Sequence, residues 1–553
     1  MSKNLIYWDS TSYIGEYPQI VKKVFDYFYL EERAEYNSWI KKISYNFSKD
    51  LDWIVSPPIS RNIYSTNLYK YICILKTLEV LTKNYYIKIL VDSAELKKII
   101  NSYFDKKKIN ALVKINKQYV LSLFYFLNIL RALYFFFIQY LITKIFLKGK
   151  IKINKNSILI DTYILDLINK EKTYYGDILN YSKKLKKKII FIPTIIENNL
   201  FNFYKIVKEL NKNKNFIFKE QFIKFNDLIY CSMYLIRKKK FNVNYSFYDK
   251  YNLSRLIFNE INSNRDLYSI FLSLYNYCFI KRLKEKNLKF KKVINWFENQ
   301  CNDKSWNFAF RKYYQDVKLY GYQGFTHYPE YMNAMPTKFE EDIKIIPEKI
   351  ILINKNYKKL RKIFYPKLRV LNGPALRFQS LFSKDSKTYE RSYNIVIFLE
   401  GASKYIDREI LLKIISASKK LENLFFYVKA HPALPIKELN LNLPKNFIIL
   451  NQKFSEIAKN TKIAISYGNT SATLESLAYG CKLIIPTKNI FDSKAIRDLR
   501  IPKNLYRTCY TQVDIYNSIL FFLRQKTFKN SINVKIRDNL FNKVNKKNLS
   551  VLI

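Results

Sequence analysis

The sequence predicts an α/β protein built on parallel sheets, and three observations support that prediction. Short apolar runs rich in β-branched residues recur along the chain, each about as long as one strand. Longer amphipathic or polar segments separate these runs, as expected where crossover helices join parallel strands. Glycine is rare, with 9 in 553 residues, and several of these glycines directly follow an apolar run.

Ten such runs are the expected strands. They are SILID (157–161), IIFIP (189–193), KVINWF (292–297), VKLYGY (317–322), KIILIN (349–354), NIVIFLE (394–400), LFFYVKAHP (424–432), FIIL (447–450), KIAIS (462–466) and KLIIP (482–486). From residue 394 onward the alternation is regular enough for one Rossmann-like domain. The expected division is an N-terminal Rossmann-like domain over 1–375, a polar linker over 376–392, a C-terminal Rossmann-like domain over 393–525 and a basic tail over 526–553.

The composition excludes a disordered or fibrous chain, because 48% of the residues are hydrophobic. A formal net charge of +51 would by itself suggest nucleic acid or an anionic membrane as a partner. Residues with A/T-rich codons are abundant, however, which gives the charge a simpler origin, so we expect no nucleic-acid partner. The six cysteines lack CxxC or metal-ligand spacing, and the start lacks the apolar core of a signal peptide. We therefore expect a cytoplasmic-side protein with neither disulfides nor a metal site.

One segment, residues 119–147, breaks the alternation. It is apolar and long enough to cross a bilayer, yet Arg131 lies near its middle and lysines flank both of its ends. A spanning helix should show a one-sided excess of positive charge, which this segment lacks. We therefore favour a helix or helical hairpin lying in the membrane interface, with buried core helices and a true span as the alternatives.

The most informative loop lies within SYGNTSATLESLAYG, residues 466–480. A strand is expected to end at Ser466, and the helix ATLESLAY is expected to end at Gly480. The loop between them contains Gly468, Asn469, Thr470 and Ser471. Hydroxyls and open backbone N–H groups at a helix N-terminus suit phosphate, whereas ordinary helix capping is the alternative. Glu475 lies one residue too far along for a capping box, and its carboxylate suits ribose hydroxyls.

Two more loops are expected at the same sheet edge. His431 and Pro432 follow one predicted strand, and Glu400 and Gly401 follow another. A lone histidine is usually structural, and this chain has only two histidines. Because open α/β sheets bind ligands at the carboxyl ends of their strands, we assign these four residues to the same ligand site as the loop at 466–471.

A further cluster of candidate residues occurs in the N-terminal half, from WFENQCNDKSWNFAFRKYY (296–314) to GYQGFTHYP (321–329). Its members are Trp296, Glu298, Asp303, Trp306, Arg311, Gln323 and His327. Aromatic faces interleaved with polar groups suit sugar binding, although tryptophan is as often part of a core.

These motifs support a resemblance to known families. KAHP followed by SYGNTSATLES is similar to the HP and Ser/Thr motifs of bacterial sialyltransferase- and Kdo-transferase-like enzymes, and the C-terminal third looks like the donor domain of GT-B glycosyltransferases. The wider set, DWIVSPPISRN, INWFENQ, GYQGF, LNGPALRFQ, FLEG, KAHP and SATLESLAYG, resembles the bacterial surface carbohydrate biosynthesis proteins. This resemblance implies that the nucleotide and its phosphate are contacted by His431, Ser466, Thr470 and Ser471. The sequence departs from the D/E-D/E-G motif of polysialyltransferases, because LEG at 399–401 keeps only one acid and lies in the other domain.

The resemblance implies a metal-independent GT-B glycosyltransferase with two Rossmann-like domains facing a cleft and a membrane-associating insertion in the first domain. The C-terminal domain would hold a nucleotide-sugar donor, with CMP-linked sugars among the candidates, and no other cofactor is expected. The N-terminal domain would hold a lipid-linked or glycan acceptor of capsule, O-antigen or lipopolysaccharide assembly, at the cytoplasmic face of the inner membrane.

Roles follow for the candidate side chains. Glu298, or else Asp303, is expected to deprotonate the acceptor hydroxyl, with Asp9 and Glu16 as more distant alternatives. His431 and the helix start at 469–472 are expected to stabilise the departing phosphate. Two rival functions remain open. A GT-B-fold sugar-nucleotide epimerase needs no membrane segment, and a nucleic-acid-binding protein should gather its lysines in one stripe.

Overall fold

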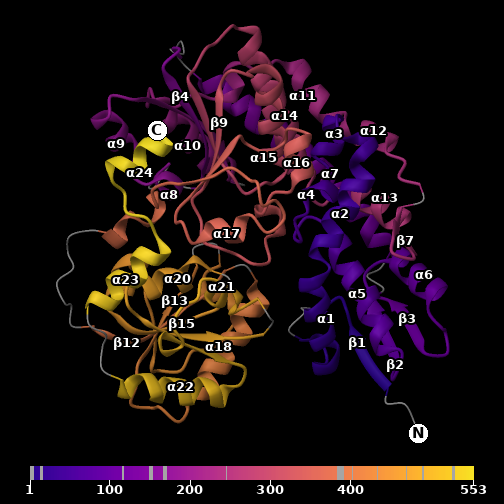
Figure 1. Cartoon of the computed structure of the whole chain (residues 1–553), viewed down its shortest axis with the longest axis vertical. Helices are drawn as coiled ribbons and strands as arrows, with labels where there is room; N and C mark the ends of the chain where they lie inside the picture. Colours follow the sequence, from indigo (N-terminus) through magenta and orange to yellow (C-terminus); the bar gives the residue numbers. More distant parts are fainter. Residues whose placement is uncertain are drawn as a thin grey trace.

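The computed structural model describes residues 5–12, 16–114, 118–147, 153–165, 171–197, 199–244, 246–382, 391–401, 403–431, 434–468, 470–488, 491–525 and 530–553, with backbone alone for 118–125 and 530–533. Two parallel six-stranded sheets dominate it, one above the other in Figure 1. Each of the ten apolar runs overlaps a strand of these sheets. The predicted α/β class with two Rossmann-like sheets is therefore confirmed.

The C-terminal sheet has the order β14-β13-β12-β15-β16-β17, and all of its neighbouring strands are parallel. Its strands are β12 Tyr393–Phe398, β13 Phe426–Lys429, β14 Phe447–Ile449, β15 Thr461–Ser466, β16 Lys482–Pro486 and β17 Tyr506–Cys509. The chain starts in the middle at β12, moves outward to β14, and then returns to β15. The direction of winding therefore reverses between β12 and β15, and open α/β sheets bind ligands at such a switch point.

Both faces of the central part of this sheet are buried, which explains why β12, β15 and β16 contain continuous apolar runs. Ile395 and Ile397 of β12 belong to the core beneath α18 (Lys404–Ser418) and α22 (Gln512–Arg524). Val396 and Phe398 point the other way, into the core shared with α20 (Ser471–Ala478). This alternation follows from the two-residue period of a strand.

The N-terminal sheet has the order β11-β10-β9-β8-β4-β5 and is also parallel throughout. Its strands are β4 Ser157–Ile164, β5 Lys188–Ile195, β8 Lys292–Trp296, β9 Lys318–Gln323, β10 Lys349–Leu352 and β11 Val370–Asn372. The winding reverses between β4 and β8, so the segment that follows β8 lies at a second switch point. α14 (Leu267–Glu285) and α15 (Cys301–Tyr313) pack against each other beside this sheet.

A third parallel sheet, β1-β2-β3, lies within the first 113 residues. Its strands are β1 Leu5–Asp9, β2 Tyr86–Val91 and β3 Ile109–Val113, and helices α1 (Gln19–Glu31), α5 (Leu68–Leu81) and α6 (Ala94–Tyr103) accompany them. The described part of the region 1–375, which we expected to be one domain, thus contains two separate parallel sheets, besides the short antiparallel pair of β6 (Phe247–Tyr248) and β7 (Tyr251–Asn252). These short strands lack a continuous apolar run, because exposed and buried residues alternate along β1 and β2.

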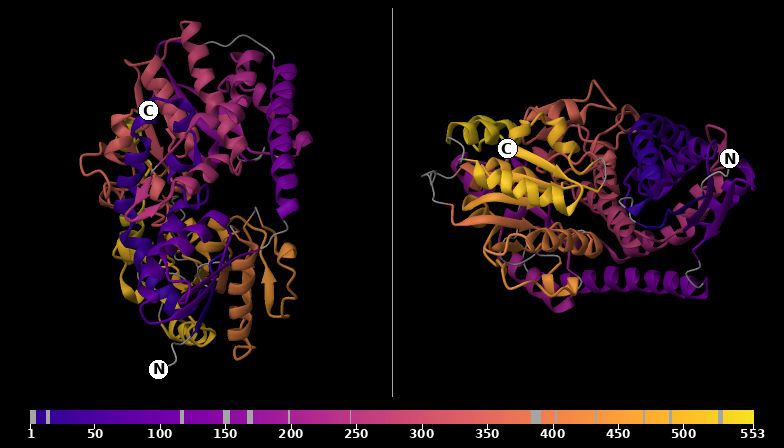
Figure 2. Two further views of the ribbon diagram at one scale, coloured as in Figure 1. Left: turned by 90° about the vertical axis from the view of Figure 1, so that its right-hand side faces the viewer. Right: turned by 90° about the horizontal axis from the view of Figure 1, so that it is seen from below.

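The apolar segment forms one helix, α7, over Gln118–Phe146. Among the described residues, Phe126–Phe146 is the one stretch long and apolar enough to cross a membrane, judged by length and composition alone. Figure 2 shows α7 lying along the outside of the molecule. Most of its side chains are not buried, which argues against the alternative of a core helix.

The C-terminal segment is packed rather than free. α23 (Asn530–Leu540) lies against α20 of the C-terminal sheet, and α24 (Lys546–Leu552) lies against β11 of the N-terminal sheet. Between the two helices, the Asn542 N–H donates to the Ile353 carbonyl (2.7 Å), and its carbonyl accepts from the Ala375 N–H (3.1 Å). Residues 530–553 therefore join the two halves. Of the predicted linker, 376–382 belong to the short helix η6 (Leu376–Phe382), and 383–390 lie outside the described residues.

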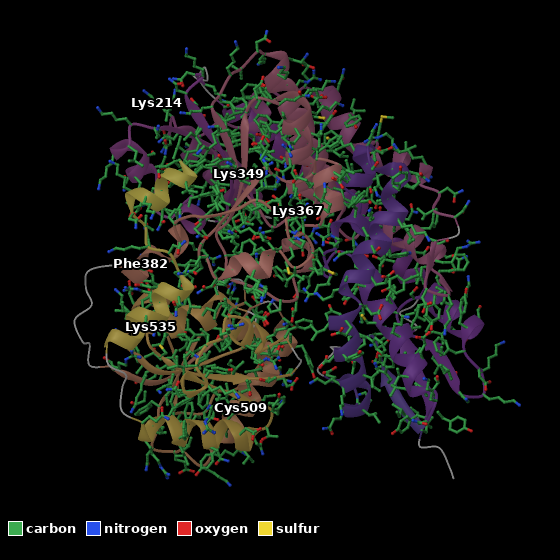
Figure 3. The ribbon with its side chains drawn as sticks, viewed as in Figure 1. Lys214, Lys349, Lys367, Phe382, Cys509 and Lys535 are labelled. Carbon is green, nitrogen blue, oxygen red and sulfur yellow. The ribbon has the colours of Figure 1, made fainter. Side chains whose placement is uncertain are left out.

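The lysines are spread over the surface. Those labelled in Figure 3 lie in both halves: Lys214 follows α10, Lys349 begins β10, Lys367 precedes β11 and Lys535 belongs to α23.

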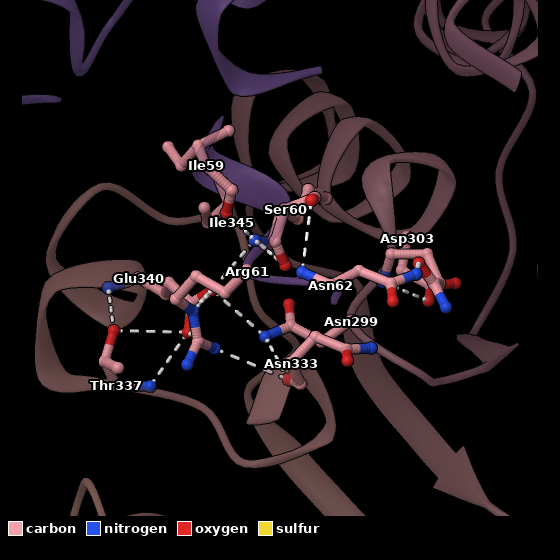
Figure 4. Close-up of polar contacts among 12 residues, drawn as sticks. Ile59, Ser60, Arg61, Asn62, Asn299, Asp303, Asn333, Thr337, Glu340 and Ile345 are labelled. Carbon is pink, nitrogen blue, oxygen red and sulfur yellow. Dashed lines mark hydrogen bonds and ion pairs between the residues drawn. The ribbon is translucent and has the colours of Figure 1, made fainter. Parts of the chain in front are cut away.

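A buried cluster of charges ties the first 62 residues to the N-terminal sheet (Figure 4). Glu340 lies 2.7 Å from the Arg61 guanidinium and 3.0 Å from Lys304 Nζ, and all three side chains are almost fully buried. Burial alone would raise the pKa of Glu340, but Arg61 and Lys304 lower it to about 2. The segment DWIVSPPISRN and the region after INWFENQ, far apart in sequence, therefore meet at one carboxylate.

We expect the Glu340→Gln variant to have a much lower free energy of unfolding than the wild type. The substitution leaves two buried cations without their counter-charge, which costs about 3 to 5 kcal/mol. In the wild type this contribution is fully present above about pH 4.5 and is lost as the pH falls towards about 2, because the folded-state pKa is depressed. Urea unfolding at neutral pH measures the loss. Glu341→Gln, one residue along and partly exposed, is the matched control, and equal stability of the two variants would contradict the account.

Candidate functional site

The loops that follow β12 and β13 touch at Gly401 and His431. Gly401 has φ +74°, and a Cβ atom added there would lie 2.3 Å from the His431 Cβ. A larger residue would therefore push the two loops apart. Asp407, in the first turn of α18, fixes the first loop by accepting the backbone N–H groups of Glu400 (3.0 Å) and Gly401 (2.8 Å).

The loop after β15 comes to the same edge of the sheet. Ser466 Oγ lies 3.0 Å from Thr473 Oγ1 and 3.3 Å from Thr470 Oγ1, so three hydroxyls cluster at the start of α20. Thr470 is the N-cap residue, yet its side chain accepts no capping hydrogen bond. The simple capping alternative is therefore not what this side chain does. A Cβ at Gly468 would lie 1.4 Å from the Asp492 carbonyl oxygen, so the loop needs glycine there.

The structure places these three predicted loops side by side at one edge of the sheet, since β13, β12 and β15 are neighbours. Ser471 is the first residue of α20, and Glu475 lies half-buried one turn further on. Pro432 and Asn469, also predicted for this site, lie outside the described residues.

Arg377 adds a cation that the sequence prediction did not assign. It is exposed on η6, the short helix that follows β11. Burial lowers the pKa of His431, and the charge of Arg377 lowers it further. Burial raises the pKa of Glu475, which Arg377 and a hydrogen bond from Ser471 oppose. Arg377 therefore lies within electrostatic reach of both residues, at the edge where the two large sheets approach.

On the N-terminal side, Glu298 follows β8 at the second switch point. Its Oε1 accepts a hydrogen bond from the indole N–H of Trp296 (2.8 Å), and the side chain is half-buried. Trp296 itself is 1% exposed and packs edge-on against the rings of Tyr174 and Tyr322. Trp296 thus orients Glu298 from the core and offers no open face for a sugar.

Asp303 has a structural position. Its carboxylate is buried and accepts the backbone N–H groups of Glu298 and Gln300, each at 3.0 Å, in the capping box of α15. Burial, followed by the charge of Glu298, raises its pKa well above the usual value. Asp303 is one of the two carboxylates that the sequence offers as the base, but these contacts make it a residue that holds Glu298 in place. The more distant alternative Asp9 lies at the end of β1, where its carboxylate accepts a hydrogen bond from Thr11 and lies 3.6 Å from Lys114.

The remaining predicted acceptor-side residues do not gather around Glu298. Gln323 is buried and connects the Ala334 carbonyl (2.9 Å) with Arg361 (2.6 Å). Arg311 pairs with Glu341 and Glu348 towards the opposite edge of the sheet, and Trp306 is part of the core beneath α14. His327 connects the two halves: its ring lies between Arg361 (2.9 Å) and Asp498 of the C-terminal half (3.2 Å). Burial lowers the pKa of His327 to about 4.

The loop after β9 supplies groups that sequence reasoning missed. Glu330 accepts a hydrogen bond from the Tyr64 hydroxyl (3.2 Å), and the ring of Tyr331 packs against those of Tyr64 (5.8 Å) and Tyr328 (5.0 Å). Burial raises the pKa of the partly buried Tyr328, and the charges of Glu475 and Glu298 raise it further, so this loop lies between carboxylates of the two halves. Sequence position could have indicated Glu330 and Arg377, because they follow β9 and β11. Both strands end at the carboxyl edge of the sheet, where ligands bind.

Glu400 completes an acidic group with residues from both halves. Burial first, and then the nearby carboxylates of Glu330, Asp407 and Asp492, raise the pKa of Glu400 to about 8. Its Oε2 is buried and meets no hydrogen-bond partner within the described part of the chain. The site therefore combines a carboxyl group that is mostly protonated at neutral pH, Glu298 and Glu330 on the N-terminal side, and the loops around His431 and Ser471.

Comparisons with solved structures give distant similarities. The crystal structure of CalG4, the calicheamicin glycosyltransferase, is 10% identical and covers 72% of this chain and 94% of that chain, with a TM-score of 0.39. MurG of Acinetobacter baumannii is 10% identical over 72% and 98%, with a TM-score of 0.38. UDP-N-acetylglucosamine 2-epimerase of Rickettsia bellii is 12% identical over 72% and 96%, with a TM-score of 0.42. No protein-family model matches the sequence, and the search of curated proteins gave no match.

We expect Glu400→Gln to stabilise the protein at alkaline pH. In the folded state Glu400 keeps its proton up to a pKa of about 8, so the stability of the wild type falls as the pH rises from about 4.5 through 8. The glutamine side chain does not titrate, so the variant does not lose this stability. Thermal unfolding should show no difference at about pH 4 and a gain of roughly 1 to 3 kcal/mol at about pH 9, allowing for solvent screening. Glu422→Gln, at an exposed carboxylate, should show no such trend. A gain that is independent of pH would refute the assignment.

Proposed function

We propose that the protein is a glycosyltransferase that moves a sugar from a nucleotide-sugar donor to an acceptor hydroxyl. One observation carries the proposal: the carboxyl edges of two parallel sheets approach each other, and groups from both, Glu330 and Glu400, interact there. Such an arrangement suits a transferase of two substrates, because each sheet can present one substrate at its own switch point.

The C-terminal sheet suits the donor. The clustered hydroxyls of Ser466, Thr470 and Thr473, together with the start of α20, favour a phosphate, since a helix N-terminus attracts an anion. The cation of Arg377 lies nearby, and the pKa of His431 is lowered, so that its ring is neutral and accepts or donates a hydrogen bond at neutral pH. Glu400, protonated near pH 7, adds no negative charge against a diphosphate or monophosphate.

The N-terminal sheet suits the acceptor and the base. Glu298 is oriented by Trp296 and by the backbone contact to Asp303, so its free oxygen has a fixed position. Glu330 faces the same region from the next loop. A carboxylate there would take the proton of the acceptor hydroxyl as that oxygen attacks the anomeric carbon, while the nucleotide phosphate leaves with the bonding electrons.

The pathway and location belong to the same proposal. We place the enzyme at the cytoplasmic face of the inner membrane, acting on a lipid-linked or glycan acceptor in the assembly of a surface polysaccharide. The motif resemblance to surface carbohydrate biosynthesis proteins and the exposed apolar helix α7 support this placement.

The donor site can be tested with a nucleotide panel. Thermal shift with CMP, UDP, GDP and CDP should select one nucleotide. His431→Ala and Ser471→Ala should each weaken binding of that nucleotide by about 1 to 3 kcal/mol, the scale of a charge-assisted hydrogen bond. Ser550→Ala, at an exposed hydroxyl near the C-terminus, is the control. Unchanged affinity in both site variants, with folding intact, would place the nucleotide elsewhere.

Base assignment can be tested by turnover. Glu298→Gln should reduce transfer by roughly two to four orders of magnitude and leave nucleotide binding unchanged, because the amide cannot accept the proton. Glu330→Gln is the competing variant, and the larger loss identifies the base. Near-normal transfer in both variants would refute this carboxylate pair. A sugar-nucleotide product that changes configuration without any acceptor would instead identify an epimerase.

A further inference from the structure

Helix α7 has two faces of different character. Ala132, Phe136, Tyr140 and Thr143 recur at intervals of three and four residues and are buried. This stripe packs against α10 (Leu200–Asn211), α14 and the short helix η3 (Lys219–Gln221). α7 is therefore attached to the folded protein along one side, over several turns.

The opposite face is apolar and uncovered. Leu127, Leu130, Tyr134, Leu141 and Ile145 are between 46% and 70% exposed. They recur at intervals that return to the same side of a helix, so they form one continuous stripe. Large contiguous apolar patches on a folded protein mark sites of interaction rather than ordinary surface.

Neighbouring helices extend this apolar stripe. Phe225, at the start of α11 (Phe225–Ser232), is 57% exposed, and its ring centroid lies 6.3 Å from that of Phe137 on α7. Phe201 of α10 is 63% exposed, and Phe146 of α7 packs against Tyr204 of the same helix (4.7 Å). We call the exposed side chains of α7 together with Phe201 and Phe225 the α7 surface.

The charges around the α7 surface are mainly positive. The α7 sequence contains no acidic residue, and its described part carries Arg131 and Lys144, both exposed. On α10, Lys205 Nζ lies 4.0 Å from the centroid of the Phe201 ring, and Lys208 lies over Tyr204. Apolar rings bordered by cations match a bilayer that contains anionic phospholipid, where rings enter the acyl boundary and cations reach the headgroups.

The α7 surface is also connected to the site. Gln139 of α7 donates to the carbonyl of Glu197 (3.1 Å), two residues beyond the end of β5. Strands of a parallel sheet all end at one edge, so α7 meets the edge at which β8 delivers Glu298.

We infer that the α7 surface docks the protein on an anionic phospholipid bilayer, with the axis of α7 in the membrane plane. The in-plane orientation follows from the inner stripe, because a helix packed on protein along one side cannot be surrounded by lipid. The inference rests on the proposed function for its purpose, presenting a lipid-linked acceptor to Glu298, but the docking itself requires no transfer activity.

Vesicle sedimentation tests the docking. The full chain should bind vesicles of phosphatidylcholine with about one-third phosphatidylglycerol and bind pure phosphatidylcholine more weakly, and salt should loosen it only partly. The double variant Leu130→Glu/Leu141→Glu should lose at least about tenfold in partitioning, because it places two charges at the acyl boundary. Ile449→Glu/Val513→Glu, at exposed apolar residues of the C-terminal half, is the matched control and should bind like the wild type.

Three results would overturn the inference: no vesicle binding by the wild type, equal losses in the two double variants, or unchanged vesicle binding when Leu130 and Leu141 are replaced. Light scattering on the same variants shows whether the apolar stripe instead joins two copies of the chain. If the wild type is a dimer, and Leu130→Glu/Leu141→Glu dissociates it but still binds vesicles, a second copy of the chain covers the α7 surface. The nucleotide panel separates this proposal from the proposed function. Vesicle binding without any nucleotide binding would refute only the transferase.

Discussion

The buried ion cluster of Arg61, Lys304 and Glu340 is the contact on which the rest of the site depends. Two cations at this depth are tolerated only because one carboxylate lies between them and receives further hydrogen bonds, including that of Asn299 Nδ2 (3.1 Å). Asn333 then donates from the next loop to the Glu298 carbonyl (2.8 Å). The loops that carry Glu298 and Glu330 are thus attached to one charged centre, which fixes the position of both carboxylates.

In the C-terminal half, glycines and backbone contacts fix the positions of the site loops. Gly401 lets the loop after β12 lie directly on His431, and Gly468 lets the loop after β15 pass the Asp492 carbonyl. In a chain with few glycines, both occur where a Cβ atom would separate the parts of one site. Contacts between the halves, such as His327 with Asp498 and Ser380 with Tyr479, then hold the two edges near each other.

Much of this arrangement follows from the sequence, for a physical reason. Strands buried on both faces are continuous apolar runs, so most of the ten predicted strands were recognisable, and with them the loops at Glu400, His431 and Ser471. The edge strand β14 was also recognisable as an apolar run, although two of its three residues are exposed. The β1-β2-β3 sheet was missed because its strands show alternating exposure. Asp303 was assigned as an alternative base, and His327 and Gln323 were assigned to the acceptor side, because sequence reveals residue type but not burial. Arg377 and Glu330 were missed because neither belongs to a distinctive local pattern, and only folding brings them to the edge.

Hydrogen–deuterium exchange with and without the nucleotide selected by the panel tests the central claim most directly. If the carboxyl edge of the C-terminal sheet binds the donor, the nucleotide should slow exchange in the loops after β12, β13 and β15 and in the first turn of α20. Exchange at the amino edges of the two large sheets, where Lys349 begins β10 and Lys482 begins β16, should be unchanged. Protection confined to the amino edge, or to α7, would contradict the account.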